Sequence, residues 1–184
     1  MNQKIIKLSR ILFKLGLRKE ASDLDAINGP AGKTEFSGIL KLMPTNPPTD
    51  LQSLLSDYFG ENGLSPLPAD KLHITLLNQA ILKPYAKELK GKPIPQYEGS
   101  LTYKDIYSVV REDEGKHSVF VVLEEQSELA GYVSEVLSSL GISAEPESNR
   151  IYHISLGNKS GSPFDSVGHS DEKPIRLEDC TKII

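Results

Sequence analysis

Two short segments of this sequence carry the same spacing of a histidine and a hydroxyl residue. They read Leu72-His73-Ile74-Thr75-Leu76 and Tyr152-His153-Ile154-Ser155-Leu156. In a β-strand successive side chains point to opposite faces, so each histidine shares a face with the hydroxyl two residues later. The apolar residues of each segment then face a core. If the two strands are neighbours, two imidazoles and two hydroxyls converge on one point, as acid–base phosphoryl transfer without a metal requires.

The repetition of the motif distinguishes it from an ordinary strand histidine. A lone histidine in a strand is usually a structural residue whose ring is satisfied by a hydrogen bond. The chain has four histidines, and two of them stand in these equivalent places. The other two, His117 and His169, lie beside turn-like sequence, and we interpret them as solvent-facing loop residues. We therefore interpret His73 and His153 as a functional pair.

The elements around the two motifs follow the same order twice. The first half predicts a strand over 36–42, a capped helix over 50–59 and the His strand over 71–77. The second half predicts a strand over 118–124, a helix over 127–140 that ends at Gly141, and the second His strand over 151–157. Leu40 precedes His73 by 33 residues and Val121 precedes His153 by 32. The pattern indicates a diverged β-α-β duplication.

The remaining segments connect or flank these two units. We expect a short helix over 83–91, a turn-rich joint after it, and a strand over 101–111 that pairs with 118–124. A terminal strand is expected over 175–177. The segment 29–34 superficially resembles a nucleotide loop, but it lacks the full spacing and a preceding strand, so we interpret it as a linker.

The paired motifs resemble those of the 2H phosphoesterase superfamily, which also includes 2′-5′ RNA ligase-like (LigT-like) proteins. The resemblance covers about residues 34–180 and rests on His73-Ile74-Thr75, on His153-Ile154-Ser155 and on the order of elements. It implies an α+β fold of two pseudo-symmetric β-α-β lobes, with antiparallel sheets around a central cleft. The expected units are an N-terminal helical segment, 1–28, and a domain over 34–184. Its lobes would be about 34–91 with 158–184, and 101–157.

The resemblance also implies roles for the motif residues and no cofactor. His73 and His153 would act as general acid and base, while Thr75 and Ser155 would hold the phosphate. Two imidazoles suit this task because histidine titrates near neutral pH. Hydroxyl groups donate hydrogen bonds to the non-bridging oxygens as charge builds up on them. The tracts 152–158 and 161–167 are similar to small phage-encoded members, some of which cleave cyclic oligonucleotide messengers of bacterial anti-phage defence.

Composition excludes several other classes. One cysteine, Cys180, rules out an internal disulfide framework and a cysteine-based zinc cluster. Neither a phosphate-binding glycine loop followed by Lys-Ser/Thr nor a His-Glu-x-x-His helix is present, and the acids form no obvious magnesium cluster, so we expect no metal. No apolar run is long enough to span a bilayer, and the lysines between apolar residues near the start make a poor secretory signal. We therefore expect a cytoplasmic protein.

Charge is distributed unevenly along the chain. The net charge is −4, yet residues 1–19 carry +6 and no acid. Apolar residues at helical spacing indicate that residues 2–27 form helices. They would either fold onto the body as a hairpin or dock onto a protein partner or an anionic surface. Outside this segment no basic surface is evident, so neither long RNA nor double-stranded DNA is an expected partner.

The expected substrate is a nucleotide-sized ribose phosphodiester, namely a cyclic oligonucleotide or a 2′,3′-cyclic phosphate. Phe36 and Tyr85 are the aromatic residues best placed to stack a base, although ordinary packing is the alternative for both. Lys71 and Arg150 stand just upstream of the His strands and are candidates for phosphate contacts. Alternatives are RNA-end processing or 2′-5′ ligation, ADP-ribose cyclic phosphate hydrolysis, a binding protein that sequesters a nucleotide, or an adaptor that acts through residues 1–28.

Overall fold

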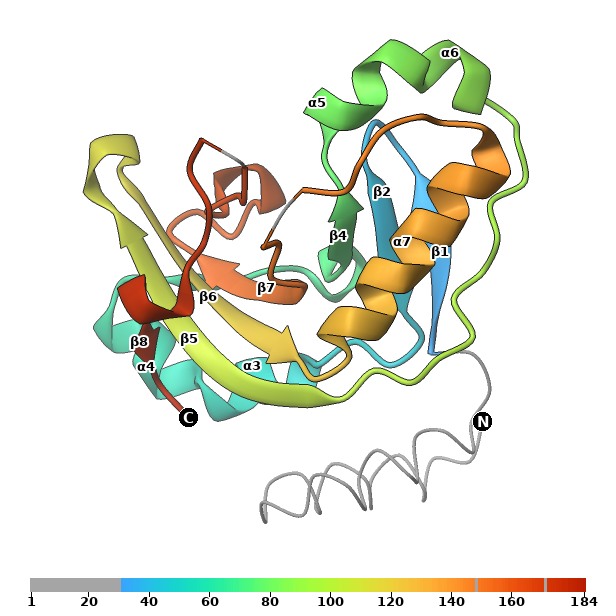
Figure 1. Ribbon diagram of the computed structural model, residues 1–184. Helices are drawn as coiled ribbons and strands as arrows, with labels where there is room; N and C mark the ends of the chain where they lie inside the picture. Colours follow the sequence, from blue (N-terminus) through green and yellow to red (C-terminus); the bar gives the residue numbers. More distant parts are fainter. Residues whose placement is uncertain (1–30, 148, 171) are drawn as a thin grey trace, which may run out of the picture.

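The computed structural model describes residues 31–147, 149–170 and 172–184 (Figure 1). The expected helical segment 1–28, with its proposed partner, lies outside the described residues. The described part is an α+β protein with one mostly antiparallel eight-stranded sheet and few helices. The expected α+β class and antiparallel pairing are therefore confirmed, and the strands of the two halves join in a single sheet.

The sheet places the two motif strands side by side at its centre. Its strand order is β1-β2-β4-β7-β6-β5-β8, and β3 pairs with β7 beside this path. The bounds are Gly32–Phe36 (β1), Leu40–Pro44 (β2), Ser65–Pro66 (β3), Ile74–Leu77 (β4), Tyr103–Arg111 (β5), Lys116–Leu123 (β6), His153–Asn158 (β7) and Thr181–Lys182 (β8).

One long helix and several short ones surround this sheet. The α-helices are Thr49–Leu54 (α3), Ser56–Glu61 (α4), Gln79–Leu82 (α5), Ala86–Leu89 (α6) and Gln126–Leu140 (α7). Single 3₁₀ turns cover Ala69–Lys71 (η1), Lys83–Tyr85 (η2), Glu112–Glu114 (η3), Pro163–Asp165 (η4) and Leu177–Asp179 (η5). Helix α7 buries Leu129, Val133 and Val136 on one face and ends at Gly141, as its sequence pattern predicts.

The beginning of the domain differs from the sequence expectation. The predicted strand 36–42 is a hairpin, because β1 ends at Phe36 and β2 starts at Leu40. Gly38 lies in the turn with φ of +85°, a conformation that a residue with a Cβ rarely adopts. The predicted linker 29–34 is also wrong in part, since β1 starts at Gly32. The sequence pattern was interpreted as one extended segment, whereas the chain reverses direction within it.

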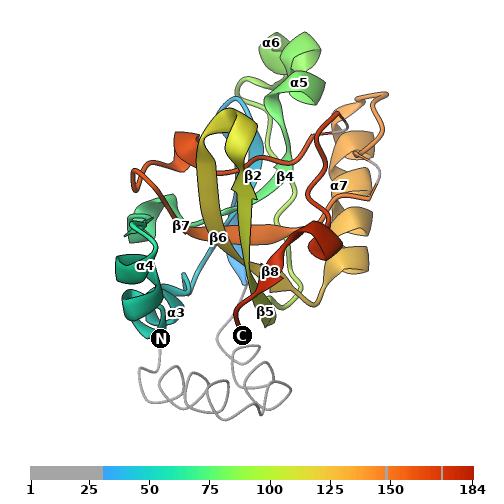
Figure 2. The same cartoon turned by 90° about the vertical axis from the view of Figure 1, so that its left-hand side faces the viewer.

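The main core lies on the face of the sheet opposite the motif histidines. Alternate residues of the two central segments are buried in it, namely Leu72, Ile74, Leu76, Tyr152, Ile154 and Leu156. Helix α7 contacts β4, and helix α3 contacts β7. Each half of the chain thus supplies a helix that packs on the motif strand of the other half (Figures 1 and 2).

A second, smaller core lies on the motif face. It joins Val109, Phe120 and Val122 of β5 and β6 to Val167 and Ile175 of the C-terminal segment. The expected strand over 175–177 is wrong, because Ile175 is irregular and η5 begins at Leu177. The terminal strand is instead β8, which pairs with β5. The C-terminal segment therefore covers the strands of the second half.

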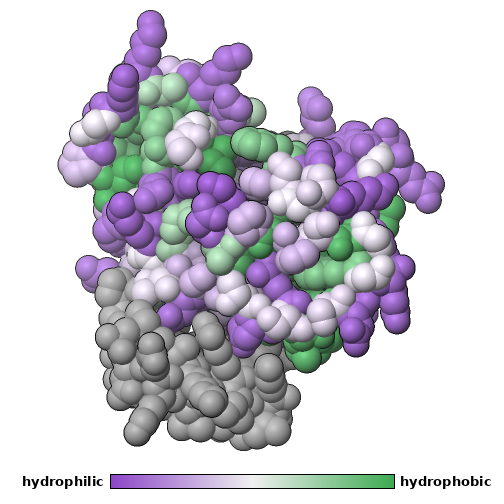
Figure 3. Space-filling view, turned by 180° about the vertical axis from the view of Figure 1, so that it is seen from behind, coloured by the Kyte–Doolittle hydropathy of each residue, from purple (hydrophilic) through white to green (hydrophobic). Residues whose placement is uncertain are grey.

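The face of the described residues that is seen from behind is mixed in polarity (Figure 3). None of the described helices has the length and apolar character that crossing a membrane demands. Among these residues the exposed large hydrophobic side chains are Leu54, Val110, Phe164 and Ile184. Phe164 is the extreme case, with 91% of its surface exposed.

Candidate active site

The register between β4 and β7 brings the two motifs together. Ile74 pairs with Ile154 in an antiparallel ladder, and both side chains are fully buried in the main core. Continuing this register places His73 opposite Ser155 and Thr75 opposite His153. Because side chains alternate along each strand, all four project from the face away from the core. An antiparallel pair has a local twofold axis, which here passes between the two isoleucines.

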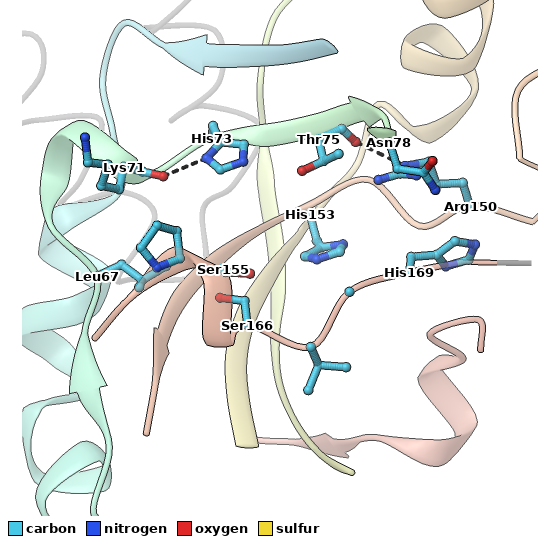
Figure 4. Close-up of a pocket in the computed structure, with 13 residues that line it drawn as sticks. Leu67, Lys71, His73, Thr75, Asn78, Arg150, His153, Ser155, Ser166 and His169 are labelled. Carbon is cyan, nitrogen blue, oxygen red and sulfur yellow. Dashed lines mark hydrogen bonds between the residues drawn. The ribbon is translucent and has the colours of Figure 1, made fainter. Parts of the chain in front are cut away.

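The four motif residues line one pocket with a volume of about 170 Å³ (Figure 4). Lys71, Asn78 and Arg150 complete the wall near the motif strands, and the segment from Pro163 to His169 forms the opposite wall. The residues predicted to be catalytic from the sequence are thus in one cavity. His73 lies just before the first residue of β4, and His153 is the first residue of β7.

Both imidazoles are oriented by the same local hydrogen bond. Nδ1 of His73 lies 2.7 Å from the carbonyl oxygen of Lys71, and Nδ1 of His153 lies 2.8 Å from that of Ile151. A carbonyl oxygen only accepts, so Nδ1 donates in each ring. The neutral form of each ring therefore leaves Nε2 unprotonated and available for proton transfer.

Burial keeps both imidazoles neutral at neutral pH. Desolvation lowers the pKa of His153 to about 4, against the raising effect of its hydrogen bond to Ile151. The positive charge of Arg150 adds to the lowering. Desolvation also lowers the pKa of His73, where Lys41 is the nearby positive charge. Lys41 pairs with Thr75 across β2 and β4, so it stands on the motif side of the sheet.

An aromatic stack supports His153 from the neighbouring strands. The ring of Phe120 in β6 lies 4.9 Å from the His153 ring, centroid to centroid, and is tilted by 57°. Tyr107 in β5 stacks on the far side of Phe120 at 5.9 Å. This packing covers one side of the imidazole and so contributes to the desolvation that lowers its pKa.

Two glutamines from different helices hold the strand that carries His153 and Ser155. Gln126 of α7 accepts from the backbone N–H of Tyr152 at 2.7 Å and donates to its carbonyl oxygen at 2.8 Å. Gln52 of α3 donates to the carbonyl oxygen of Leu156 at 2.7 Å. The backbone of β7 is thus fixed on both sides of Ile154 by side chains.

A buried polar network closes the pocket at the end of β4. Glu147 forms an ion pair with Arg150 and accepts a hydrogen bond from Asn78. Nε of Arg150 donates to the carbonyl oxygen of Thr75 at 3.1 Å. The Arg150 side chain is 4% exposed and that of Glu147 is 2% exposed. Arg150 therefore belongs to the wall, where it joins the segment before β7 to the strand of the first motif.

The other residues proposed for substrate contacts differ in position. Lys71 lines the pocket, is half exposed and forms an ion pair with Asp70 at 3.0 Å. Phe36 and Tyr85 are not among the pocket residues and pack against the main core. Packing, the alternative considered for these two aromatic residues, is what the structure shows.

His169 is a correction to the sequence interpretation. It is only 6% exposed and lines the pocket, whereas the sequence indicated a solvent-facing loop. Its Nδ1 accepts a hydrogen bond from the backbone N–H of Ile175 at 3.1 Å, so its neutral ring carries the proton on Nε2. His117 is a strand residue of β6, half-buried and 2.7 Å from the Ser108 hydroxyl. The expectation for His169 failed because the C-terminal segment packs on β5 and β6. The expectation for His117 failed because β6 already begins at Lys116, so that His117 pairs with Val110 in the ladder.

Asn78 is a site residue that sequence reasoning missed. Its Oδ1 accepts from the backbone N–H groups of Ala80 and Ile81 and caps α5, while its Nδ2 binds Glu147. Asparagine before a helix is a recognisable cap signal, and here it stands three residues after Thr75.

In the ranges that the structure describes, no three or more His, Cys, Asp or Glu side chains gather so as to hold a metal ion.

Three comparisons with known proteins found no match to this chain. No family model matches the chain, and the curated proteins and the solved structures give no match either.

Proposed function

We propose that this protein is a metal-independent phosphodiesterase of the 2H type. The observation that carries the proposal is the pairing of β4 with β7, which puts two histidines and two hydroxyls in one pocket. Each histidine faces a hydroxyl on the opposite strand, and each ring presents Nε2 as its reactive nitrogen. Acid, base and oxyanion donors are therefore available within one cavity.

The favoured reaction is attack by a ribose 2′-hydroxyl on the adjacent phosphorus. One imidazole removes the proton from the 2′-oxygen as the new P–O bond forms. The other imidazole, in its protonated form, delivers a proton to the leaving oxygen as the old P–O bond breaks. Thr75 and Ser155 donate hydrogen bonds to the non-bridging oxygens. Which histidine is acid and which is base depends on the orientation of the substrate, and the roles exchange when water opens a cyclic product.

The lowered pKa of both histidines fits a site in which the bound substrate causes one imidazole to take up a proton. A bound phosphodiester carries a negative charge, which raises the pKa of an imidazole beside it. One ring then takes up the proton that the acid role requires. Lys41 and Arg150 lower the pKa of the motif histidines, but Glu35 and Glu147 pair with them, so the proton that the acid role requires is favoured by the charge of the substrate itself.

The proposal includes two pseudo-symmetric lobes related by the local twofold between β4 and β7. Two matched irregularities support it. On β2 the register shifts between Leu40 and Lys41, and Lys41 pairs with Thr75. On β6 the register shifts between Val119 and Phe120, and Phe120 pairs with Ser155. Equivalent bulges at equivalent distances from the two hydroxyl residues are what a duplicated unit would retain.

The substrate class that we propose is a cyclic oligonucleotide messenger or a 2′,3′-cyclic phosphate. The pocket is smaller than the about 300–1,000 Å³ of sites that enclose a whole drug-sized ligand. It therefore suits one phosphodiester and its sugar rather than a complete nucleotide. Cleavage of a defence messenger on behalf of a phage follows from the resemblance of the motifs, and RNA-end processing is the alternative enzymatic role.

A nucleotide-sequestering protein is the second candidate function. The packing of Phe120 against the His153 ring favours it, because desolvation of this ring lowers its pKa to about 4 and keeps it from acting as an acid until a ligand changes it. Binding without turnover would then be the result of a substrate that leaves both rings neutral.

The test is incubation with cyclic di- and trinucleotides, 2′,3′-cyclic mononucleotides and 2′-5′-linked dimers, followed by chromatography of the products. Turnover should persist in EDTA and be lost in His73→Ala and His153→Ala, with the circular dichroism spectrum unchanged. A substrate with a 2′-deoxy sugar at the scissile position should resist cleavage. Full activity of either histidine variant would contradict the proposal, and binding without products would favour sequestration.

A further inference from the structure

Phe164 is an exposed aromatic side chain in the segment 163–169 that forms one wall of the pocket, and it is not itself a lining residue. It is the middle residue of η4, and 91% of its surface is exposed to solvent. Pro163 before it and Ser166 shortly after it both line the pocket. An exposed phenyl ring gives up the stabilisation that burial of such a side chain provides. Because Pro163 and Ser166 of the same segment line the pocket, a ligand that extends out of the cavity on this side would pass near Phe164.

The backbone that carries Phe164 is fixed at its base. Asn158, which is fully buried, donates to the carbonyl oxygen of Ser162 at 2.6 Å and to the hydroxyl of Ser166 at 3.0 Å. Its Oδ1 accepts from the backbone N–H of Gly161 at 2.8 Å. After the turn, the N–H of Val167 donates to the Ser118 hydroxyl at 2.8 Å. The ring is therefore presented on a loop held at both ends.

The size of the pocket determines where a nucleobase would lie. The cavity of about 170 Å³ is below the about 300–1,000 Å³ of sites that enclose a whole drug-sized ligand, so we infer that it holds the phosphate and sugar of a nucleotide with the base at its rim. The base must then rest on the rim, and η4 supplies part of that rim. Bases bind exposed aromatic rings by stacking, which tolerates any base because each one has a π-face.

We propose that Phe164 is the surface on which a nucleobase of the substrate stacks while the phosphodiester occupies the His73–His153 pocket. This inference rests on the proposed function and specifies its ligand as a nucleotide with an unpaired base. Phe164 takes the role that the sequence suggested for Phe36 and Tyr85, which are packed against the core. Because stacking does not read base edges, both purines and pyrimidines are accepted, with the larger purine surface preferred.

A direct test uses the absence of tryptophan from the chain. Phe164→Trp introduces one fluorophore at the proposed stacking position. Titration with adenosine 3′-monophosphate should quench its emission saturably, whereas inorganic phosphate should not. The matched control is Val110→Trp, at a residue of β5 that is 55% exposed and does not line the pocket. Its emission should not respond to either ligand, and equal quenching in both variants would contradict stacking at Phe164.

A kinetic test separates this inference from the proposed activity. Phe164→Ala should raise the KM for 2′,3′-cyclic AMP about tenfold, which corresponds to about 1.4 kcal/mol. The KM for the methyl riboside 2′,3′-cyclic phosphate, which has no base, should not change. An unaltered KM for 2′,3′-cyclic AMP in Phe164→Ala would overturn the stacking role, and turnover by the wild type would still uphold the phosphodiesterase proposal. Quenching of the Phe164→Trp emission without any turnover by the wild type would support stacking and contradict the phosphodiesterase proposal.

Discussion

The imidazole of His153 packs against the ring of Phe120 with their centroids 4.9 Å apart. Phe120 belongs to β6 and, with Val122, faces the C-terminal segment rather than the main core. The side chain that desolvates the histidine is thus also one that anchors the far wall of the pocket. Phe120 thus contributes both to the low pKa of His153 and to the packing of Val167 in the far wall.

Phe120→Ala should therefore raise the pKa of His153 from about 4 toward its ordinary value of 6.5, because water would reach the ring. An NMR titration of the imidazole measures the shift. The cavity costs about 3–5 kcal/mol of stability, so Phe120→Leu, with a smaller shift of the same sign, is the second variant. Val119→Ala, on the opposite face of β6, should cost stability and leave this pKa unaltered; an equal shift there would refute the explanation.

Stability should decrease in mild acid because of His153. Its pKa is depressed in the folded state, so between pH 6.5 and about 4 the unfolded chain binds more protons than the folded one. The contribution of His153 to the free energy of unfolding is therefore fully present above pH 6.5. It decreases as the pH falls, by at most about 1.4 kcal/mol per pH unit for one group. Urea denaturation at several pH values measures this slope. His153→Gln should flatten it, and an unchanged slope would assign the effect elsewhere.

Gln126→Ala should lower both stability and turnover. The substitution leaves the backbone N–H and carbonyl of Tyr152 without their side-chain partner, which costs about 1–3 kcal/mol. It also frees the start of β7, where His153 stands. Chemical denaturation and steady-state kinetics check the two effects. Ser134→Ala on the exposed side of α7 is the control, and its stability should stay within about 0.5 kcal/mol of wild type.

Glu147→Gln should be strongly destabilising because it removes the acid that pairs with the buried Arg150 guanidinium. Loss of one partner of a buried ion pair costs about 3–5 kcal/mol. Thermal and urea denaturation give the change, and Glu145→Gln, at an exposed site two residues away, provides the comparison. Equal stability of the two variants would show that the Asn78–Glu147–Arg150 network contributes nothing to the fold.

Local alternation and periodicity were sufficient to predict the motif strands and α7. Leu72, Ile74 and Leu76 are buried as the period of two requires, and the helical stripe of α7 is buried up to Leu140. These patterns depend on a side chain's own neighbours in sequence. The convergence of the four motif residues was conditional on strand adjacency, which the β4–β7 ladder supplies.

The parts that the sequence did not predict depend on contacts between distant segments. His169 is buried because the C-terminal segment packs on Phe120 and Val122, and no local pattern encodes that contact. The first hairpin was missed because Phe36 before Gly38 and Ile39, Leu40 and Leu42 after it look like one strand, and Gly38 reverses the chain between them. Phe164 was passed over because its exposure and its position beside the pocket are properties of the folded loop.

The exchange of helices between the halves has a consequence for dissection of the molecule. Helix α7 rests on β4 and α3 rests on β7, so a cut in the joint near residue 95 separates each helix from the strand that it covers. Neither fragment would hold more than one imidazole of the pair. Two co-expressed fragments should therefore regain turnover only by reassociating, which makes the chain a natural candidate for a split reporter.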